Sequence, residues 1–307
     1  MTVFRAFVPN PAAPGGVELA EVEPPVARDD QALVAVEAYS INRGETFLLA
    51  KPRPGWRPGQ DVAGRVREPA ADGSGPPAGA RVVGHAWDGG WAPLVPVATD
   101  ALVELPESVS TVAAATLPLA GLTVLRLLRV SGSLAGRQVL VTGASGGVGH
   151  LLVELAAAQG ARITAVSSRG ERLTALGADV VRRVEDATGP FDVAFESVGG
   201  PSLEAALARM AEHGTVIWFG GVSGEPASID FFSLPAGATL RHFVYWREGA
   251  SDADDLSALI RLAAGGHIHP EVGLVADWHE TPDALIALSE RRLRGNAVLT
   301  IERNDDV

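Results

Sequence analysis

The sequence predicts an α/β protein with two domains, one β-rich and one built on a doubly wound parallel sheet. The chain has 307 residues, a length typical of two domains. Roughly the first 110 residues hold short alternating segments between Gly- and Pro-rich turns, which indicate an all-β unit. Beyond them, apolar strands alternate with helical stretches, a pattern typical of a parallel sheet that is covered on both faces.

The β-rich part is recognised from its strands and its turns. Residues 32–38 ("ALVAVEA") and 62–66 read as short strands. Between such strands lie the turn-forming stretches "PAAPGG", "KPRPGWRPG" and "ADGSGPPAGA". We expect a partly barrel-like unit here.

The second part follows a strand–helix order. Strands are expected at 138–142, 162–167, 180–184, 191–196, 214–219 and 240–246, with helices at 147–159, 171–176 and 201–210 and an amphipathic helix in "DDLSALIRLAAGG". The tail returns to strand and turn character in "IHPEVGLVADW" and "AVLTIE", around one helix at 283–292. We therefore expect residues 1–113 and 266–307 to form one discontinuous domain and residues 114–265 to form the other.

Composition excludes several functions. The net charge of −12 argues against a nucleic-acid or anionic-membrane partner, so small molecules are the expected partners. The chain has no cysteine, which rules out disulfides, thiolate nucleophiles and Cys-ligated metal sites. No apolar run is long enough to span a membrane and "MTVFRAFVPN" contains no signal-peptide core, so a cytoplasmic location is expected.

The stretch "VLVTGASGGVG" at 139–149 has the form of a dinucleotide-binding turn. A strand that ends in glycines and opens a helix brings backbone N–H groups against a pyrophosphate. The letters also fit the T-G-x-x-x-G-x-G turn of short-chain dehydrogenases, which requires a Tyr with a Lys four residues later. The tyrosines are Tyr39 and Tyr245 and the single lysine is Lys51, so that pair cannot form. A glycine-rich turn without a ligand is the remaining alternative.

The end of the next strand indicates which dinucleotide binds. Ser167, Ser168 and Arg169 stand where an NAD enzyme carries an acidic residue for the ribose 2′-hydroxyl. Hydroxyls and a guanidinium suit a 2′-phosphate, so NADPH is the expected cofactor. Arg172 is an alternative ligand for the phosphate. The remaining alternative is that Arg169 only lies in a solvated loop and binds no phosphate.

Eight segments in order resemble the medium-chain dehydrogenase/reductase superfamily, in its zinc-independent quinone oxidoreductase and enoyl reductase branch. They are "SINRGE", "PGQDVAGRV", "AGARVVG", "LPLAGLTV", "VLVTGASGGVG", "LGAD", "ESVGG" and "RGNAVLTIE". The resemblance implies a GroES-like catalytic domain and a Rossmann domain, with the cofactor in the cleft between them. It also implies a homodimer, with an edge strand near 240–245 pairing across the two-fold axis.

Zinc-dependent members of the superfamily carry a Cys within the stretch 42–45 and a His at the place of Gln60, and this chain has neither. Glu45, Gln60 and Asp61 alone would make a poor zinc site. His267 and His269 in "GHIHP" are expected to alternate across a strand and to face opposite sides. No metal site is therefore predicted.

The resemblance implies a set of cofactor-binding positions. Asn42 matches a residue near the nicotinamide and the substrate, Thr123 one beside the cofactor, and Asn296 a position often held by Lys. The pyrophosphate turn and the strand ends supply the remaining positions, which are Ser145, Gly146, Gly147, Val148, Ser197, Val198, Phe219, Gly220, Gly221 and Val222.

These features predict a zinc-independent, NADPH-dependent reductase of a quinone or an α,β-unsaturated carbonyl, whose developing charge is delocalised to an oxygen. Asn42, Tyr39 and Arg43 are the candidates for polarising the carbonyl, with water supplying the proton. The alternative is that Tyr39 and Arg43 are packing or surface residues. An NADPH-binding protein without turnover and a non-redox accessory enzyme, such as a cyclase, are the competing functions.

Overall fold

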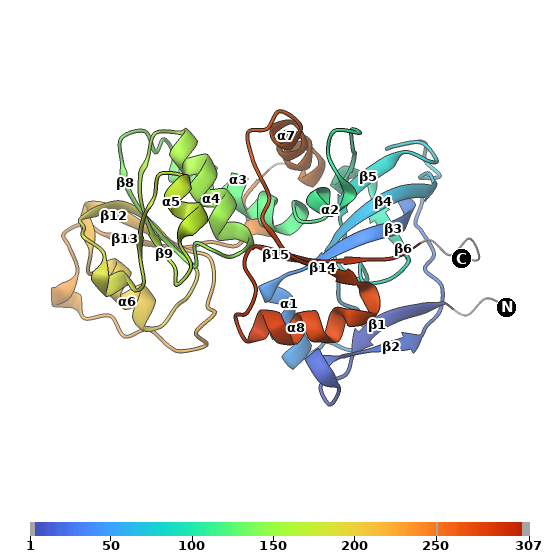
Figure 1. The fold of residues 1–307 in the computed structure, drawn as a ribbon, viewed down its shortest axis with the longest axis horizontal. Coiled ribbons are helices and arrows are strands. Elements are labelled where there is room, and N and C mark those ends of the chain that lie inside the picture. The colour runs from blue at the N-terminus through green and yellow to red at the C-terminus, as the bar shows by residue number, and fades with distance from the viewer. Residues whose placement is uncertain (1–3, 250, 303–307) are drawn as a thin grey trace. The chain divides into compact units, whose positions relative to one another are not determined.

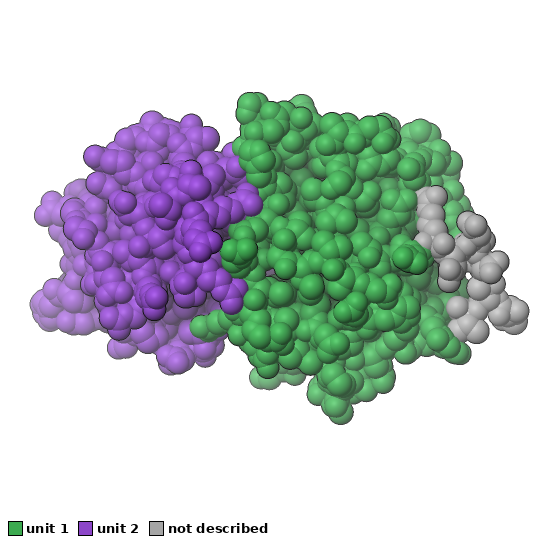
Figure 2. Space-filling model, in the orientation of Figure 1, with its two compact units in different colours: residues 1–122, 250–307 green, residues 123–249 purple. Residues whose placement is uncertain are grey.

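The computed structural model describes residues 4–249 and 251–302. The chain divides into two compact units, residues 1–122 with 250–307 and residues 123–249 (Figure 2). The chain leaves the first unit within helix α3 (Pro118–Ser131). The domain boundaries expected from the sequence, after residues 113 and 265, stay a prediction.

The first unit is built on a largely antiparallel sheet, in which the edge strand β14 pairs in parallel with β15 (Figure 1). Within the described residues it has seven strands in the order β14-β15-β3-β4-β5-β7, with β6 also paired to β3, and β1 and β2 form a separate ribbon. The elements are β1 (Arg5–Pro9), β2 (Val17–Glu21), β3 (Gln31–Ile41), α1 (Arg43–Ala50), β4 (Asp61–Glu68), β5 (Arg81–His85), β6 (Leu94–Ala98), β7 (Leu102–Glu104), α2 (Thr111–Ala114), α7 (Asp252–Ala264), β14 (Val272–Asp277), α8 (Thr281–Ser289) and β15 (Asn296–Thr300).

Strand β3 is the centre of this unit. It pairs with β4, β6 and β15, and most of its eleven residues are buried. Tyr39 on this strand stacks on Trp91 with ring centroids 6.0 Å apart, and both side chains are fully buried. Through β14 and β15 the tail of the chain belongs to this sheet, so residues far apart in sequence become neighbours.

The second unit contains a parallel sheet with the strand order β10-β9-β8-β11-β12-β13 among the described residues (Figure 1). The order reverses direction beside β8, which is the arrangement of a doubly wound dinucleotide-binding fold. Its elements are β8 (Gln138–Thr142), α4 (Gly147–Ala158), β9 (Arg162–Val166), α5 (Glu171–Ala175), β10 (Asp179–Val181), β11 (Phe191–Glu196), α6 (Pro201–Leu207), β12 (Met210–Trp218) and β13 (Thr239–His242).

The expected α/β class is confirmed, whereas several local expectations are wrong. The strand expected at 180–184 ends at Val181, and the helix expected at 283–292 ends at Ser289. Helix α6 ends at Leu207 because β12 begins at Met210. The strand expected at 240–246 ends at His242, and a 3₁₀ turn follows at Tyr245–Arg247. His267 and His269 lie in the link between α7 and β14, outside any strand, so the expected alternation does not apply. No helix in the described ranges is long and apolar enough to cross a membrane.

Candidate functional site

The glycine-rich turn joins β8 to α4. Gly143 adopts φ +61°, and the Gly146 N–H donates to its carbonyl oxygen at 3.0 Å. A Cβ on Gly149 would lie 2.4 Å from that same oxygen, so the helix approaches the turn as closely as glycine allows. Gly146 is the N-cap and offers no side chain to the first N–H groups of α4. Such a helix start suits a phosphate.

Glu196, at the end of β11, fixes the neighbouring strand ends. Its carboxylate is fully buried and accepts hydrogen bonds from the Thr142 hydroxyl (3.1 Å), the Ser202 hydroxyl (2.9 Å) and the N–H groups of Val198 (3.0 Å) and Gly199 (2.9 Å). Four donors around one carboxylate compensate for its burial. Glu196 therefore ties the end of β8 to the turn that follows β11.

The turns after β11 and β12 lie against each other. The Ser197 hydroxyl donates to the carbonyl oxygen of Thr142 at 3.1 Å, and the Val222 N–H donates to that of Ser197 at 3.3 Å. A Cβ on Gly220 would meet the Ser197 oxygen at 2.6 Å. The structure thus brings the expected positions at 197–198 and 219–222 together, beside the β8 end of the glycine-rich turn.

Ser167, Ser168 and Arg169 follow directly on β9. The Ser167 hydroxyl accepts from the Arg169 N–H at 3.0 Å and donates to the Arg169 carbonyl oxygen at 2.8 Å, which folds the segment into a tight turn. Ser168 and Arg169 are exposed. Thr123, another expected position, is buried in α3.

A second polar cluster lies in the first unit, at the start of β4. Asp61 is fully buried and accepts three hydrogen bonds, from Ser40 Oγ at 2.5 Å, Asn42 Nδ2 at 2.7 Å and the Leu119 N–H at 2.8 Å. Ser40 lies directly opposite Asp61 in the β3–β4 register. Burial raises the pKa of Asp61 above its ordinary value, while the hydrogen bonds from Asn42, Ser40 and Leu119 act in the opposite direction.

Glu45 supports the same region from the first turn of α1. It is fully buried and accepts the N–H groups of Asn42 at 2.8 Å and Gly59 at 3.0 Å. Burial raises the pKa of its carboxyl to about 8. Asn42, the N-cap of α1, is therefore held by Glu45 through a reciprocal capping box and by Asp61 through its side-chain nitrogen.

Asn296 begins β15. Ala297 pairs with Ile41 in the antiparallel β15–β3 register, and continuing that register by one residue places Asn296 opposite Asn42. Its side-chain nitrogen is buried without a hydrogen-bond partner among the described residues. An orphaned donor of this kind is costly unless a ligand or water satisfies it.

Tyr39 and Arg43, the other two residues expected to polarise a carbonyl, make different contacts. The Tyr39 hydroxyl is buried and lies 2.6 Å from Thr281 Oγ1, and burial raises its pKa well above the ordinary value. Arg43 donates to the carbonyl oxygens of Leu288 at 2.5 Å and Ser289 at 3.4 Å, at the end of α8. Burial lowers its pKa. These contacts give both side chains partners within the first unit, and the expected role of either in polarising a carbonyl stays a prediction.

Sequence reasoning missed two organising carboxylates. The sequence indicates Asp61 only as one member of a poor zinc site and Glu196 only as part of "ESVGG". An acidic residue at the start or end of an otherwise apolar strand is the signal that would have found both, because a buried carboxylate needs donors from its neighbours.

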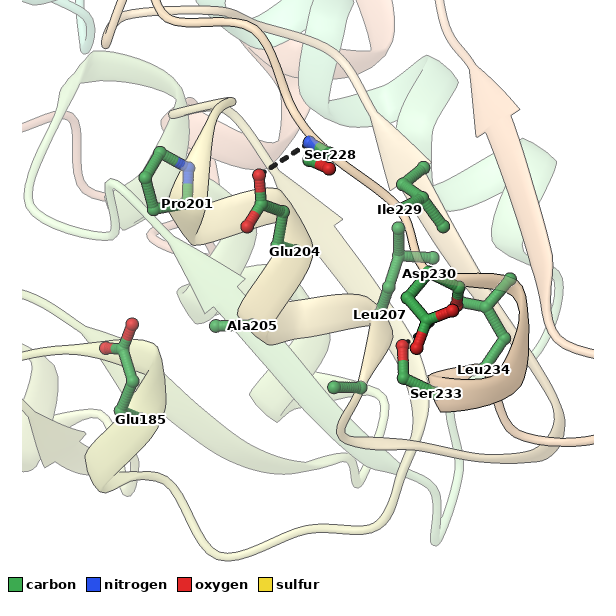
Figure 3. Close-up of a pocket in the computed structure, with 11 residues that line it drawn as sticks. Glu185, Pro201, Glu204, Ala205, Leu207, Ser228, Ile229, Asp230, Ser233 and Leu234 are labelled. Carbon is green, nitrogen blue, oxygen red and sulfur yellow. Dashed lines mark hydrogen bonds between the residues drawn. The ribbon is translucent and has the colours of Figure 1, made fainter.

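A separate cavity of about 420 Å³ lies along α6 (Figure 3). Its walls come from residues 201–208, from the segment 228–234 and from Glu185, and the Ser228 N–H donates to Glu204 at 2.6 Å. The residues that line it do not include the expected cofactor positions.

The carboxylates near Asn42 do not suit a zinc ion. Glu45 and Asp61 already accept N–H and O–H donors, and His85, which lies opposite Asp61 in the β4–β5 register, has its Nδ1 2.7 Å from Asp252 Oδ2. In the described part of the chain, no group of three or more His, Asp or Glu residues is placed to hold a metal.

Comparison with known proteins places the chain among dehydrogenases and reductases. A family model described as "Zinc-binding dehydrogenase" matches residues 147–265. The chain is 30% identical to the quinone oxidoreductase of Mus musculus, covering 67% of this chain and 70% of that protein. It is 31% identical to the 2-methylene-furan-3-one reductase of Solanum lycopersicum, covering 69% of this chain and 61% of that protein.

Solved structures are similar in fold to this chain over a longer span than the sequence matches. A mycobacterial protein complexed with NADPH has a TM-score of 0.87 at 25% identity, covering 98% of this chain and all of that one. The Escherichia coli quinone oxidoreductase complexed with NADPH has a TM-score of 0.86 at 22% identity, covering 97% of this chain and 99% of that one. The chain spans 61%, 63% and 65% of three of the curated relatives it matches.

Proposed function

Because the chain belongs to the quinone oxidoreductase-like branch of the medium-chain dehydrogenase/reductase superfamily, we propose that it is an NADPH-dependent oxidoreductase. Its proposed acceptor is a quinone or an α,β-unsaturated carbonyl. The observation that carries the proposal is the β8–α4 turn, which leaves the start of α4 uncapped by side chains and packs so tightly that Gly149 has no room for a Cβ.

The second unit supplies the proposed site for the pyrophosphate and the adenosine. The backbone of the turn, Ser145 to Val148, would hold the pyrophosphate at the N-terminus of α4. The exposed Arg169 and Ser168, with the hydroxyl-bearing Ser167, would recognise the 2′-phosphate. Relatives of this fold are complexed with NADPH, which supports the choice of dinucleotide.

Asn42, Thr123 and Asn296 are the proposed contacts of the nicotinamide end, together with the turns at 197–198 and 219–222. The buried side-chain nitrogen of Asn296 supports a ligand at this position, because no acceptor among the described residues takes its hydrogen bond. We give no catalytic role to Tyr39 or Arg43, whose polar groups are engaged by Thr281 and by the end of α8.

NADPH, when bound, supplies a hydride at C4 of the dihydronicotinamide. The residues of this chain bind and orient the two reactants, and a zinc-independent reaction is proposed because the donor set around Asn42 does not suit the metal. A quinone or enone is already electrophilic, so it does not need a metal to polarise it. One proton from water completes the reduction to hydroquinone or saturated carbonyl.

The experiment is turnover of purified, chelator-treated protein with NADPH and a panel of quinones and enones. We expect NADPH oxidation that depends on the acceptor and persists after metal removal. Tight NADPH binding without oxidation by any acceptor would instead favour the cofactor-binding or accessory function. A requirement for stoichiometric zinc would overturn the metal-free mechanism.

A homodimer is proposed as the assembly. Strand β13 ends the sheet, pairing only with β12 among the described residues. Leu240 on this strand is 39% exposed, and Phe231 and Phe232, in the segment that precedes the strand in the sequence, are 80% and 91% exposed, which is unusual for a bare surface. Light scattering is expected to give a molar mass of twice the chain mass of 31.8 kDa. The Leu240→Arg variant should lower the measured mass toward that of a single chain. A monomeric wild type would contradict this proposal.

A cytoplasmic location stays a prediction.

A further inference from the structure

We propose that His150 is a positioning residue of the cofactor site, which fixes the peptide group at the start of α4 so that its N–H faces the pyrophosphate of NADPH. The inference deepens the proposed function and rests on it, because it requires the β8–α4 turn to bind a dinucleotide. His150 is the fourth residue of α4, and the proposed reaction gives it no role of its own.

His150 is a buried polar ring in an otherwise apolar stretch of α4. Its side chain is fully buried, as are those of Leu151, Leu152 and Val153, which follow it. An apolar side chain would occupy such a position without the cost of taking an imidazole out of water. A ring that is buried here needs hydrogen-bond partners, and one of these partners belongs to the glycine-rich turn.

That partner is the carbonyl oxygen of Gly146. Nδ1 of His150 lies 2.9 Å from this oxygen, and the His150 backbone N–H donates to the same oxygen at 3.2 Å. A carbonyl oxygen only accepts, so Nδ1 carries the hydrogen. The oxygen has two lone pairs, so the ring adds a bond to the helical one and does not replace it. His150 therefore holds the Gly146 carbonyl with two donors.

Holding the Gly146 carbonyl also aims the N–H of Gly147. Both groups belong to one planar trans peptide, in which they point in opposite directions. The carbonyl points along the helix toward His150, so the N–H points out of the helix start, where an anion would bind. A donor on the carbonyl also polarises the peptide, which makes its N–H a stronger donor.

This peptide needs such an anchor because a glycine lies on each side of it. Gly146 and Gly147 have no Cβ, so the dihedral angles that turn the peptide between them are less restricted than in other residues. The rest of the turn is packed around Gly143, whose oxygen accepts the Gly146 N–H at 3.0 Å and lies against Gly149. The His150 bonds hold the other side of Gly146, its carbonyl.

Threonine and valine at position 150 make the informative pair of variants. The two side chains are β-branched and similar in shape, but a helical Thr can donate from its hydroxyl to the carbonyl four residues earlier, and Val cannot. That carbonyl is the one of Gly146. His150→Val therefore removes the side-chain donor, and His150→Thr restores one at the same loss of volume. Leu152→Val is the matched control, because it shortens a fully buried side chain of α4 and removes no donor.

The measurement is binding of NADPH and of 2′-AMP to the full chain, together with the KM for NADPH and kcat. His150→Val should raise the Kd and the KM for NADPH about 5- to 10-fold, because a donor to the pyrophosphate loses its orientation. His150→Thr should stay within about twofold of wild type. Leu152→Val should lower Tm and leave the Kd for NADPH unchanged. The Kd for 2′-AMP, which has the 2′-phosphate but no pyrophosphate, and kcat at saturating NADPH should be the same in all four proteins.

A purely structural role for His150 gives different results. His150→Val would then weaken NADPH and 2′-AMP equally, or would lower Tm and leave both Kd values unchanged, and either result overturns the inference. Equal NADPH affinities of His150→Val and His150→Thr would also overturn it. His150→Leu keeps more of the ring volume without a donor and replaces His150→Val in the comparison if circular dichroism shows that His150→Val is unfolded. Failure of wild type to bind NADPH would instead refute the proposed function.

Discussion

Replacing Gly149 with alanine tests the tight packing of the β8–α4 turn. The added Cβ would lie 2.4 Å from the Gly143 oxygen and 2.6 and 2.8 Å from backbone atoms of Ala144, where real contacts fall at 3.4–4 Å. Backbone cannot move aside cheaply, so the cost lies near the upper end of the ~1–3 kcal/mol typical of overpacking. Alanine regains about 1 kcal/mol as the better helix former. A net loss of about 2 kcal/mol is expected, which lowers Tm by about 4–8 °C.

The same substitution should weaken NADPH binding, because the N–H groups that would face the pyrophosphate shift with the turn. Losing one or two charge-assisted hydrogen bonds corresponds to about a 10- to 100-fold higher Kd. Scanning calorimetry and fluorescence titration measure the two effects. Gly44→Ala is the control, since a Cβ there meets no atom within 4 Å, and it should keep or raise Tm. If Gly149→Ala retained both the wild-type Tm and the wild-type Kd, the tight-turn reasoning would be refuted.

Three further predictions concern single side chains. Arg169→Ala should weaken NADPH binding about tenfold without changing NADH binding; an unchanged NADPH to NADH ratio would redirect the assignment to Arg172. Tyr39→Phe should lower stability by about 0.5–1.5 kcal/mol, because Thr281 loses a buried partner, and should leave kcat unchanged. The Glu45 pKa of about 8 exceeds the ordinary 4.5, so the folded state loses its extra proton as pH rises from 5 to 8. The free energy of unfolding of wild type, measured by urea titration, should therefore fall relative to that of Glu45→Gln over this range. Parallel plots of unfolding free energy against pH for the two proteins would contradict this.

The parallel sheet could be predicted from sequence because its signal is local. Strands such as 138–142 ("QVLVT") and 191–196 ("FDVAFE") are rich in apolar residues, and both lie where the sequence predicts them. Element ends were harder to predict because tertiary contacts decide them. The strand expected to reach Trp246 stops at His242 because β13 pairs with β12 only over Thr239–His242.

The polar cluster around Asn42 shows what local pattern cannot supply. Ser40, Asp61 and Leu119 are far apart in sequence, and only the β3–β4 register and the start of α3 bring their donors to one carboxylate. The motif resemblance named Asn42 but gave no information about its contacts. Its side-chain nitrogen donates to Asp61 and its side chain accepts the Glu45 backbone N–H, and both partners are known only from the structure.

The measurement that tests the central proposal most directly is single-turnover oxidation of NADPH by the purified chain, with deuterium placed at either C4 position of the nicotinamide. If the protein transfers a hydride, an acceptor should accelerate NADPH oxidation, and one of the two labels should slow that step by a primary isotope effect. NADPH that binds but is oxidised no faster with any quinone or enone, or at a rate that neither label changes, would contradict the account.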